Sequence, residues 1–461
     1  MKNLNLSETL YALFHLREVR HTTLNPYGPG SVRIHLVPPK ISFNKRTPFL
    51  VFLNGKDILP IKPSWAILLS VFIEEVNFYE GKEITQDDLK KIILKTIRKV
   101  KKVYPRASSE LLKKDLQRMI NSFVNIAYGK DPGEEIGIIS IGDYAEFMLA
   151  PHRLDLMLSS MSKNGCWHCN QKCLHCYAAD QEYGNTPELS TEEWKKIIDS
   201  CRKIGVPQIT FTGGEPTLRS DLVEIVSYAK WFVTRLNTNG VLLTENLCSK
   251  LYEAELDSVQ ITLYSSDEKI HNTLVGADNF KKTVAGIKNA VSAGLNVSIN
   301  TPLCTLNSDY SKTLEFINSL GVKYVSCSGL IPTGNATTEE SKQLRLSSEE
   351  MKKLLSDATL KAEDLHIQIS FTSPGWVNED SLKNMKLDVP ACGACLSNMA
   401  ITPDGKVVPC QSWLTSGYNL GDFLKDDWDS IWNSELCKEI RNNSAKMDNF
   451  CQLNNIKRGD K

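Results

Sequence analysis

The sequence predicts an α/β protein whose central part is a parallel sheet covered by helices. From about residue 154 onward, short apolar runs alternate with amphipathic stretches of helical length, giving six successive strand–helix units. Such alternation calls for parallel strands with helices outside. Other patterns flank this region: strands followed by helices before residue 150, and a cysteine-rich segment after residue 376. We therefore expect a smaller domain at each end.

Composition narrows the possible function classes. The chain has 461 residues, with 54 basic and 54 acidic side chains. Balanced charge gives no overall field that would favour nucleic acid or a membrane surface. The first residues lack the features of a signal peptide, and no run approaches the roughly 18 apolar residues of a membrane span. We expect a cytoplasmic protein, in which 13 cysteines point to metal rather than disulfides.

Residues 1–150 are expected to form a domain of strands followed by three helices. Residues 31–37 alternate apolar and polar side chains, as a strand does. Asn54-Gly55 is predicted to be a two-residue hairpin turn between strands at 48–53 and 58–61. Helices are predicted at 64–78, from Thr85 as N-cap, and at 108–128.

Each of the six central units combines a short apolar strand pattern with an amphipathic helix pattern. Strands are predicted at 154–160, 208–212, 233–238, 259–264, 297–301 and 324–328. Helices are predicted at 190–204, 221–230, 244–254, 279–293, 308–320 and after Ser347. Substrate sites in such sheets lie at the C-terminal ends of the strands. The segments that follow the strands are therefore where functional residues are expected.

The segment after the first central strand carries Cys169, Cys173 and Cys176 in C-x3-C-x2-C spacing. Three thiolates this close together can hold three irons of one cubane cluster. The fourth iron would then be open to chelate a substrate or cofactor. The alternatives are a chance trio of core cysteines or a zinc knuckle, although zinc usually takes four ligands.

A second motif, Gly213-Gly214-Glu215-Pro216, closes the second central strand. Its glycines let the backbone approach a ligand closely, because no Cβ intervenes. A carboxylate beside exposed carbonyls can bind an ammonium group by charge-assisted hydrogen bonds. On its own the motif fits any strand-to-helix turn.

At this separation, the two motifs resemble the signature of the radical S-adenosylmethionine (radical SAM) superfamily. The resemblance implies an open, TIM-like (β/α)6 partial barrel over residues 151–375. It implies a [4Fe–4S] cluster at the three cysteines, SAM on its open iron, and the SAM amino group on the glycine–glutamate motif. Reduction, by a donor such as flavodoxin or ferredoxin, would yield a 5′-deoxyadenosyl radical that abstracts hydrogen. Further SAM contacts are expected at His175, Asn239, Thr262, Asn300 and Ile331.

The pattern of residues 81–89, followed by Tyr104-Pro105 and a helix, resembles a RiPP recognition element. This winged helix-turn-helix-like domain serves ribosomally made, modified peptides. The resemblance implies that a leader peptide adds a strand to the sheet edge and packs on the third helix. A DNA-binding winged helix and an unrelated structural extension are the alternatives.

The C-terminal residues 376–461 hold five cysteines, and Cys395, Gly405 and Cys410 have C-x9-G-x4-C spacing around a hairpin turn at 402–406. This resembles the SPASM/twitch extension, which binds auxiliary [4Fe–4S] clusters. The absent C-x2-C-x5-C-x3-C run argues against a second cluster, and a structural zinc is the alternative. The expected ligands are Cys392, Cys395, Cys410 and Cys451, with Cys437 competing for the fourth place.

The resemblance as a whole predicts a radical SAM enzyme that modifies a ribosomal precursor peptide by forming a thioether or carbon–carbon crosslink, or by epimerisation. Alternatives are a radical SAM enzyme acting on a small molecule or a sulfatase-like protein, and an iron–sulfur regulator that binds DNA. The SAM-amine motif argues against the regulator. No catalytic acid or base can be named. The other cysteines are expected to be core or bystander residues: Cys166, Cys201, Cys248, Cys304 and Cys327.

Overall fold

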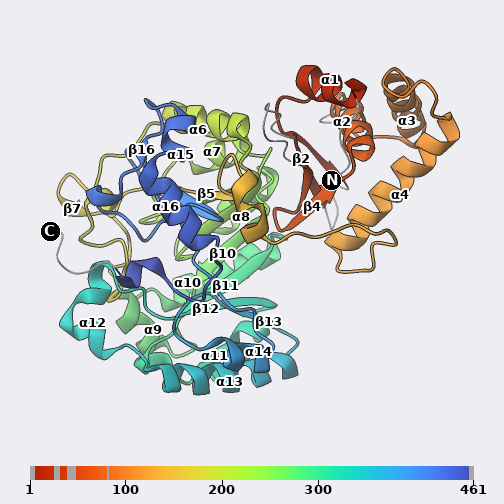
Figure 1. The fold of residues 1–461 in the computed structure, drawn as a ribbon. Helices are drawn as coiled ribbons and strands as arrows, with labels where there is room; N and C mark the ends of the chain where they lie inside the picture. Colours follow the sequence, from red (N-terminus) through yellow and green to blue (C-terminus); the bar gives the residue numbers. More distant parts are fainter. Residues whose placement is uncertain (1–5, 25–31, 39–47, 80–81, 456–461) are drawn as a thin grey trace. The chain divides into compact units, whose positions relative to one another are not determined.

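The computed structural model describes residues 6–24, 32–38, 48–79 and 82–455. It separates into two compact units, drawn in Figure 1: Met1–Ala150 with Ser200–Pro207, and Pro151–Asp199 with Gln208–Lys461. Ser31 and Gly81, which belong to two of the predicted patterns, lie outside the described residues. None of the helices in the described ranges combines the length and apolar character that a membrane crossing requires.

The first unit contains an antiparallel sheet in the order β1-β2-β3-β4. Its strands are β1 (Arg20–Leu24), β2 (Val32–Val37), β3 (Phe49–Leu53) and β4 (Asp57–Ile61). The three predicted strands are confirmed, and β1 is additional. The predicted two-residue turn is wrong, because Leu53 pairs with Asp57 and leaves a three-residue loop. Asn54 and Gly55 have φ of 48° and 64°, a region that asparagine and glycine tolerate.

The three predicted helices of the first unit are also confirmed. The helical elements are α1 (Leu6–His15), α2 (Pro63–Asn77), α3 (Gln86–Val100), α4 (Ser109–Ala127), α5 (Ile141–Tyr144) and the 3-10 turn η1 (Ala145–Phe147). Thr85 begins α3 as predicted, since its hydroxyl accepts the Asp88 N–H at 3.2 Å. The Asp88 carboxylate accepts the Thr85 N–H at 3.3 Å in return, which completes a capping box.

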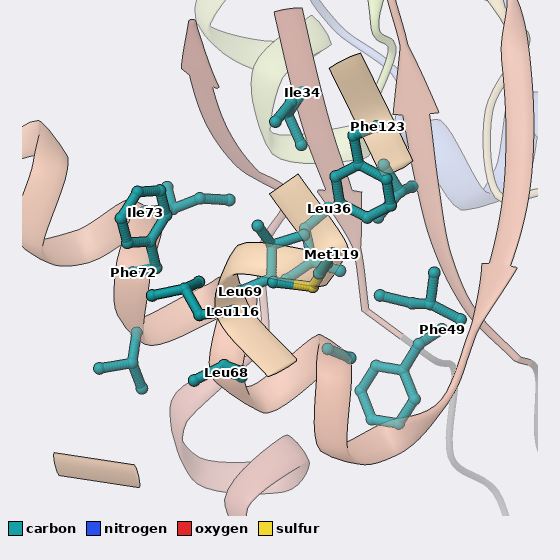
Figure 2. Packing of buried hydrophobic residues seen from close by; sticks show 14 of the residues in the cluster. Ile34, Leu36, Phe49, Leu68, Leu69, Phe72, Ile73, Leu116, Met119 and Phe123 are labelled. Carbon is teal, nitrogen blue, oxygen red and sulfur yellow. The ribbon is translucent and has the colours of Figure 1, made fainter. Parts of the chain in front are cut away.

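Apolar side chains from the strands and helices form one core in the first unit. Figure 2 shows Leu36 of β2 beside Leu69 of α2, with Met119 and Phe123 of α4 packed against them. Trp65 meets Phe123 edge-on, with ring centroids 6.5 Å apart. Burial of these large side chains, each contributing about 1.5–3 kcal/mol, holds α2 and α4 on the sheet.

The second unit is built on a ten-stranded sheet in the order β13-β12-β11-β10-β9-β8-β5-β14-β15-β16. Neighbours from β13 to β14 are parallel, and the last two pairs are antiparallel. All six predicted strands are confirmed as consecutive neighbours. They are β5 (Arg153–Ser159), β8 (Gln208–Gly213), β9 (Val233–Thr238), β10 (Ser258–Thr262), β11 (Val297–Pro302) and β12 (Tyr324–Ser328). β13 (Gln368–Phe371) extends one edge, and β6 (Ser162–Lys163) and β7 (Cys166–Trp167) form a separate hairpin.

Helices follow the strands as the alternation predicts. The six predicted helices are α6 (Thr191–Ile204), α7 (Leu222–Tyr228), α8 (Glu245–Glu253), α10 (Phe280–Ser292), α11 (Tyr310–Ser319) and α13 (Ser348–Asp364). Additional helices are α9 (Glu268–Val275), α12 (Glu339–Gln343), α14 (Glu379–Asn384), α15 (Trp428–Trp432) and α16 (Glu435–Ser444). Short 3-10 turns are η2 (Glu182–Gly184), η3 (Pro216–Leu218), η4 (Thr305–Asn307), η5 (Gly334–Thr337), η6 (Ser416–Tyr418) and η7 (Gln452–Asn455). Figure 1 shows α11 and α13 together beside β12 and β13.

The cysteine-rich C-terminal segment joins the same sheet. β14 (Asn398–Ile401) pairs in parallel with β5, and β15 (Lys406–Val408) and β16 (Gly421–Asp422) follow it. The predicted hairpin turn at 402–406 is confirmed, since the Lys406 N–H donates to the Thr402 hydroxyl at 2.9 Å. Residues 208–461 therefore belong to one compact unit. The division of the chain into 1–150, 151–375 and 376–461 stays a prediction.

Candidate functional site

Two backbone hydrogen bonds hold the three-cysteine segment to the C-terminal end of α9. The Lys172 N–H donates to the Val275 carbonyl at 2.9 Å, and the Leu174 N–H donates to the Leu274 carbonyl at 3.0 Å. Gly276 ends α9 with φ of 63°, and a Cβ there would stand 2.4 Å from the Lys172 carbonyl oxygen. Only glycine lets the two backbones approach so closely.

A second clamp comes from the loop after β12. The Asn335 N–H donates to the Cys176 carbonyl at 2.9 Å, and its side-chain amide donates to the Cys173 carbonyl at 3.1 Å. Gly334 has φ of 56°, and its Cβ would lie 2.4 Å from the Cys176 oxygen and 2.5 Å from the Tyr177 oxygen. The last strand–helix unit thus positions the cysteines of the first.

The thiols themselves suit a cluster that demands thiolates. Burial raises the pKa of Cys169 to about 12, and it raises the pKa of Cys173 and Cys176 as well. A thiol must lose its proton to bind metal, so three thiolates here require a compensating cation, which cluster irons supply. Within the described ranges, no group of three or more His, Cys, Asp or Glu side chains has the spacing to hold a metal ion.

The glycine–glutamate motif lies directly against the end of β5. Gly213 has φ of 132°, and a Cβ there would approach the Ser159 oxygen to 2.4 Å. A Cβ on Gly214 would approach the Ser160 oxygen to 2.6 Å. The Gly214 carbonyl accepts the Cys169 thiol at 3.4 Å. Both glycines are needed for this approach, and the motif and the cysteines meet at one point.

Glu215 is a buried carboxylate held by hydrogen bonds alone. One oxygen accepts from the Thr217 N–H at 3.0 Å, from the Thr217 hydroxyl, and from the Thr238 hydroxyl at 2.7 Å. The other accepts the Asn239 N–H at 2.8 Å. Burial raises the pKa of Glu215, and no cationic side chain among the described residues pairs with it. The second oxygen has capacity for a cationic ligand.

Asparagines connect this carboxylate to the cysteine segment. The Asn239 side chain donates to the Asn170 side-chain oxygen at 2.6 Å. Asn279 donates to the Asn170 backbone carbonyl at 3.2 Å. The Asn170 amide nitrogen is buried and, in the part of the chain that the structure describes, has no acceptor. Such an orphaned donor beside three thiols fits a site that takes up a further polar group.

His175 is buried, and both of its ring nitrogens lack partners among the described residues. Burial lowers the pKa of His175 to about 4, so the ring is neutral at pH 7. It packs edge-on against Tyr264, with ring centroids 5.1 Å apart. The Tyr264 side chain also bonds to the Cys173 thiol. His175 therefore lies beside the cysteines, and its assignment as a SAM contact stays a prediction.

Two of the residues predicted to contact SAM are adjacent in the sheet. Thr262 of β10 is directly opposite Asn300 of β11. The Asn300 side-chain oxygen accepts the Ser326 hydroxyl at 3.0 Å, and Gln260 donates to the same hydroxyl at 3.1 Å. These polar side chains share one face of the strands. Ile331 follows β12, and within the described residues it takes no part in this network.

The five C-terminal cysteines gather as two hydrogen-bonded pairs and one further thiol. The bond from Cys451 lowers the pKa of Cys392, and the bond from Cys395 lowers the pKa of Cys437. Burial raises the pKa of Cys410 to about 12, and its charge acts on both pairs. The structure thus brings together the four predicted ligands and their competitor. Five sulfur donors, of which Cys395 and Cys437 are buried and the other three partly exposed, suit a thiolate-bound cluster.

Three residues that position this site were not predicted from the sequence. Asn170 and Asn335 hold the cysteine segment, and Tyr177 contacts Gln411 of the C-terminal segment. A signal existed for Asn335, because Gly334-Asn335 follows the sixth strand, where ligand sites are expected. The four cysteines predicted to lie in the core are confirmed as buried. Cys166 is exposed, and the buried ones are Cys201, Cys248, Cys304 and Cys327.

Two family models match the chain in these regions. Residues 168–317 match the Radical SAM superfamily, and residues 392–454 match the SPASM iron–sulfur cluster-binding domain. A radical SAM domain implies a [4Fe–4S] cluster and SAM, and a SPASM domain implies auxiliary iron–sulfur clusters. The first match spans the three cysteines and the glycine–glutamate motif, and the second spans all five C-terminal cysteines.

Two relatives by sequence are named as a GTP cyclase and a heme synthase. A probable GTP 3′,8-cyclase of Saccharolobus solfataricus is 29% identical over 275 residues, which cover 58% of this chain and 87% of that protein. An AdoMet-dependent heme synthase of Methanosarcina barkeri is 28% identical over 295 residues, covering 59% of this chain and 82% of that protein.

A solved structure resembles the chain over a longer span. Streptococcus suis SuiB, crystallised with the precursor peptide SuiA, aligns with a TM-score of 0.57 at 15% identity. The alignment covers 86% of this chain and 87% of SuiB. At this identity the likeness concerns the fold, and it extends well beyond the two regions that the family models match.

Proposed function

We propose that this chain, whose residues 168–317 and 392–454 match the Radical SAM and SPASM families, is a radical SAM enzyme that modifies a ribosomally synthesised precursor peptide. The product would be a thioether, a carbon–carbon crosslink or an epimerised residue. The single observation that carries the proposal is the fold alignment to SuiB over 86% of the chain. The GTP cyclase relative covers only 58%, so it leaves much of the chain without a counterpart.

In this proposal, Cys169, Cys173 and Cys176 hold the SAM-binding cluster. With SAM bound, the cluster supplies the one-electron chemistry that removes a hydrogen atom from an unactivated carbon. The chain's residues position the reactants. Glu215 offers its second carboxylate oxygen to the SAM ammonium group, and Asn239 keeps that carboxylate against the cysteine segment.

The remaining SAM contacts are assigned by their place in the fold. Thr262 and Asn300 lie opposite each other on the polar face of β10 and β11, where a ribose or carboxylate would find donors and acceptors. His175 and Ile331 would line the apolar side, and Pro216 begins η3 behind the carboxylate. The strands that bear them form part of the proposed (β/α)6 partial barrel.

The first unit would receive the peptide. Its four-stranded sheet with α2, α3 and α4 supports a recognition element of the winged helix-turn-helix kind. An extended leader segment would pair with an outer strand of this sheet through main-chain hydrogen bonds. A flavodoxin or ferredoxin would deliver electrons to the cluster, and the auxiliary cluster would accept an electron from the product radical or ligate the substrate.

One experiment distinguishes a peptide substrate from a nucleotide substrate. The reconstituted enzyme, SAM and dithionite would be incubated anaerobically with a synthetic copy of a short peptide encoded beside this gene, and separately with GTP. Peptide-dependent 5′-deoxyadenosine together with a peptide mass change supports the proposal. Turnover with GTP alone would replace it with the second candidate, a nucleotide substrate, which the 29% identity to the GTP cyclase favours.

A further inference from the structure

Arg441 is a buried cation without an acidic partner. Its side chain is 8% exposed and lies on α16. Among the described residues it forms no ion pair with a carboxylate. A guanidinium remains charged in a protein interior, and burying a charge without a counter-ion costs several kcal/mol. A buried, unpaired guanidinium therefore indicates that an anionic group binds next to it.

The contacts of Arg441 show where that anion lies. The terminal nitrogen Nη1 donates to the Trp432 carbonyl at 3.0 Å and to the Cys437 sulfur at 3.4 Å. The guanidinium also sits over the Trp432 ring, 3.9 Å from its centroid. The ring and the carbonyl fix the guanidinium in place, so one of its fixed N–H groups points at sulfur.

Cys437 is itself fully buried and belongs to the C-terminal cysteine group. It shares a hydrogen bond with Cys395, which lies in the C-x9-G-x4-C pattern. Its competitor for the fourth ligand position, Cys451, pairs instead with Cys392, and no arginine of the described residues hydrogen-bonds to its sulfur. The position that Arg441 marks is therefore that of Cys437.

We propose that Cys437 is a ligand of the auxiliary cluster and that Arg441, by donating to the Cys437 sulfur, raises the reduction potential of that cluster. A thiolate-bound cluster is anionic, and its reduced form carries one more negative charge. A fixed cation with a hydrogen bond to a ligand sulfur stabilises the reduced form more than the oxidised form. The inference concerns the auxiliary cluster and is independent of the substrate.

The test uses the full-length, reconstituted protein and two readouts. The first is iron content of Cys437→Ser beside wild type, where a loss of about four irons per chain is expected for one cubane. The second is the midpoint potential of the auxiliary cluster, followed by electron paramagnetic resonance at stepped potentials. Arg441→Gln should retain its iron and shift the midpoint to a more negative value.

The expected shift corresponds to at least a tenfold lower ratio of reduced to oxidised cluster at fixed potential, or about 59 mV for one electron. Arg441→Lys should recover part of it, because the charge remains while the planar donor is lost. Lys438→Gln removes an exposed charge on α16 that also acts on the Cys437 thiol. It is the matched control for charge alone: Lys438 makes no hydrogen bond to the sulfur and solvent screens it, so its substitution should shift the midpoint much less than Arg441→Gln.

Two results would overturn the proposal. Full iron content in a folded Cys437→Ser protein would remove Cys437 from the ligand set. Equal midpoints for wild type, Arg441→Gln and Lys438→Gln would remove the role of Arg441. If Cys437→Ser fails to fold, the potentials of the Arg441 variants decide alone.

Discussion

The Tyr177 hydroxyl donates to the side-chain oxygen of Gln411 at 3.3 Å. Tyr177 directly follows Cys176, and Gln411 directly follows Cys410. One hydrogen bond therefore joins two cysteine-bearing segments that are 234 residues apart in the chain. Tyr177 is therefore a direct link between the segments that carry the two groups of thiols.

Tyr177→Phe should destabilise the protein while preserving both clusters. The substitution keeps the ring and leaves the Gln411 oxygen without its donor, a loss of about 0.5–1.5 kcal/mol. Denaturant unfolding followed by circular dichroism measures this loss. Tyr252→Phe, whose side chain is 55% exposed, serves as the control. Identical unfolding free energies for the two variants would contradict a role for the bond.

Cys173→Ala should abolish SAM cleavage, whereas Cys410→Ala should spare cleavage and stop product formation. Cys173 is expected to ligate the cluster that holds SAM, and Cys410 the auxiliary one. Anaerobic 5′-deoxyadenosine formation and product mass are the measurements. Cys166→Ala is the control, because that thiol is exposed and close in sequence. SAM cleavage retained in the Cys173 variant would refute the assignment.

The triple Ala variant of Cys169, Cys173 and Cys176 tests how many clusters the chain binds. After reconstitution, wild type should contain about eight irons and the variant about four, as two cubanes require. Iron and acid-labile sulfide are measured on the same samples. A wild-type content of about four irons, all lost in the variant, would mean that the C-terminal cysteines hold no cluster.

Glu215→Gln should weaken SAM binding by about 10- to 100-fold, because a charge-assisted hydrogen bond is lost. The carboxylate must be ionised to hold an ammonium group, and burial raises its pKa above the ordinary 4.5. Binding should therefore weaken as pH falls through that raised pKa, and the variant should lose this acid dependence. Calorimetric titration between pH 5 and 8 measures both effects, with iron content confirming an intact cluster. Parallel pH profiles would argue against Glu215.

Gly334→Ala should impair assembly of the three-cysteine cluster. The new Cβ would clash with the Cys176 and Tyr177 carbonyl oxygens at a backbone φ of 56°, a strain worth more than about 1 kcal/mol. Iron bound after reconstitution and unfolding free energy are both expected to fall. Gly417→Ala is the matched control, since a Cβ at that residue would have no atom within 4 Å. Equal iron content in both variants would exclude the proposed clamp.

Folding stability should fall between pH 6.5 and 4 in part because of His271. Burial lowers the pKa of His271 to about 4, so the unfolded chain takes up a proton below pH 6.5 that the folded chain refuses. The stabilisation that comes from keeping His271 neutral is fully present above pH 6.5. As the pH falls below 6.5, it is lost at up to about 1.4 kcal/mol per pH unit. His271→Phe should reduce this slope in urea unfolding at pH 7.5 and 5. The exposed His366→Asn should leave it unchanged, and equal slopes would contradict the prediction.

Local patterns in the sequence were sufficient for the elements that are built locally. The six central strands and their helices follow from apolar periodicity, and Thr85 followed by Asp88 encodes the start of α3. The C-x3-C-x2-C segment and the Gly213–Glu215 motif need no tertiary knowledge, because each is contiguous. The predicted turn at Asn54 has two residues, one fewer than the loop in the structure. Its length depends on how β3 and β4 pair, which neither strand's own sequence specifies.

Contacts between distant segments were decided by the tertiary structure alone. Only the order of strands in the sheet brings Asn335 to Cys176, or Tyr177 to Gln411. The same holds for Cys437, whose side chain bonds to the Cys395 thiol and to Arg441. The sequence by itself determined which side chains can supply thiolates and a carboxylate. Chain packing determined which of them meet, because a hydrogen bond or a ligand position depends on distances that sequence separation does not encode.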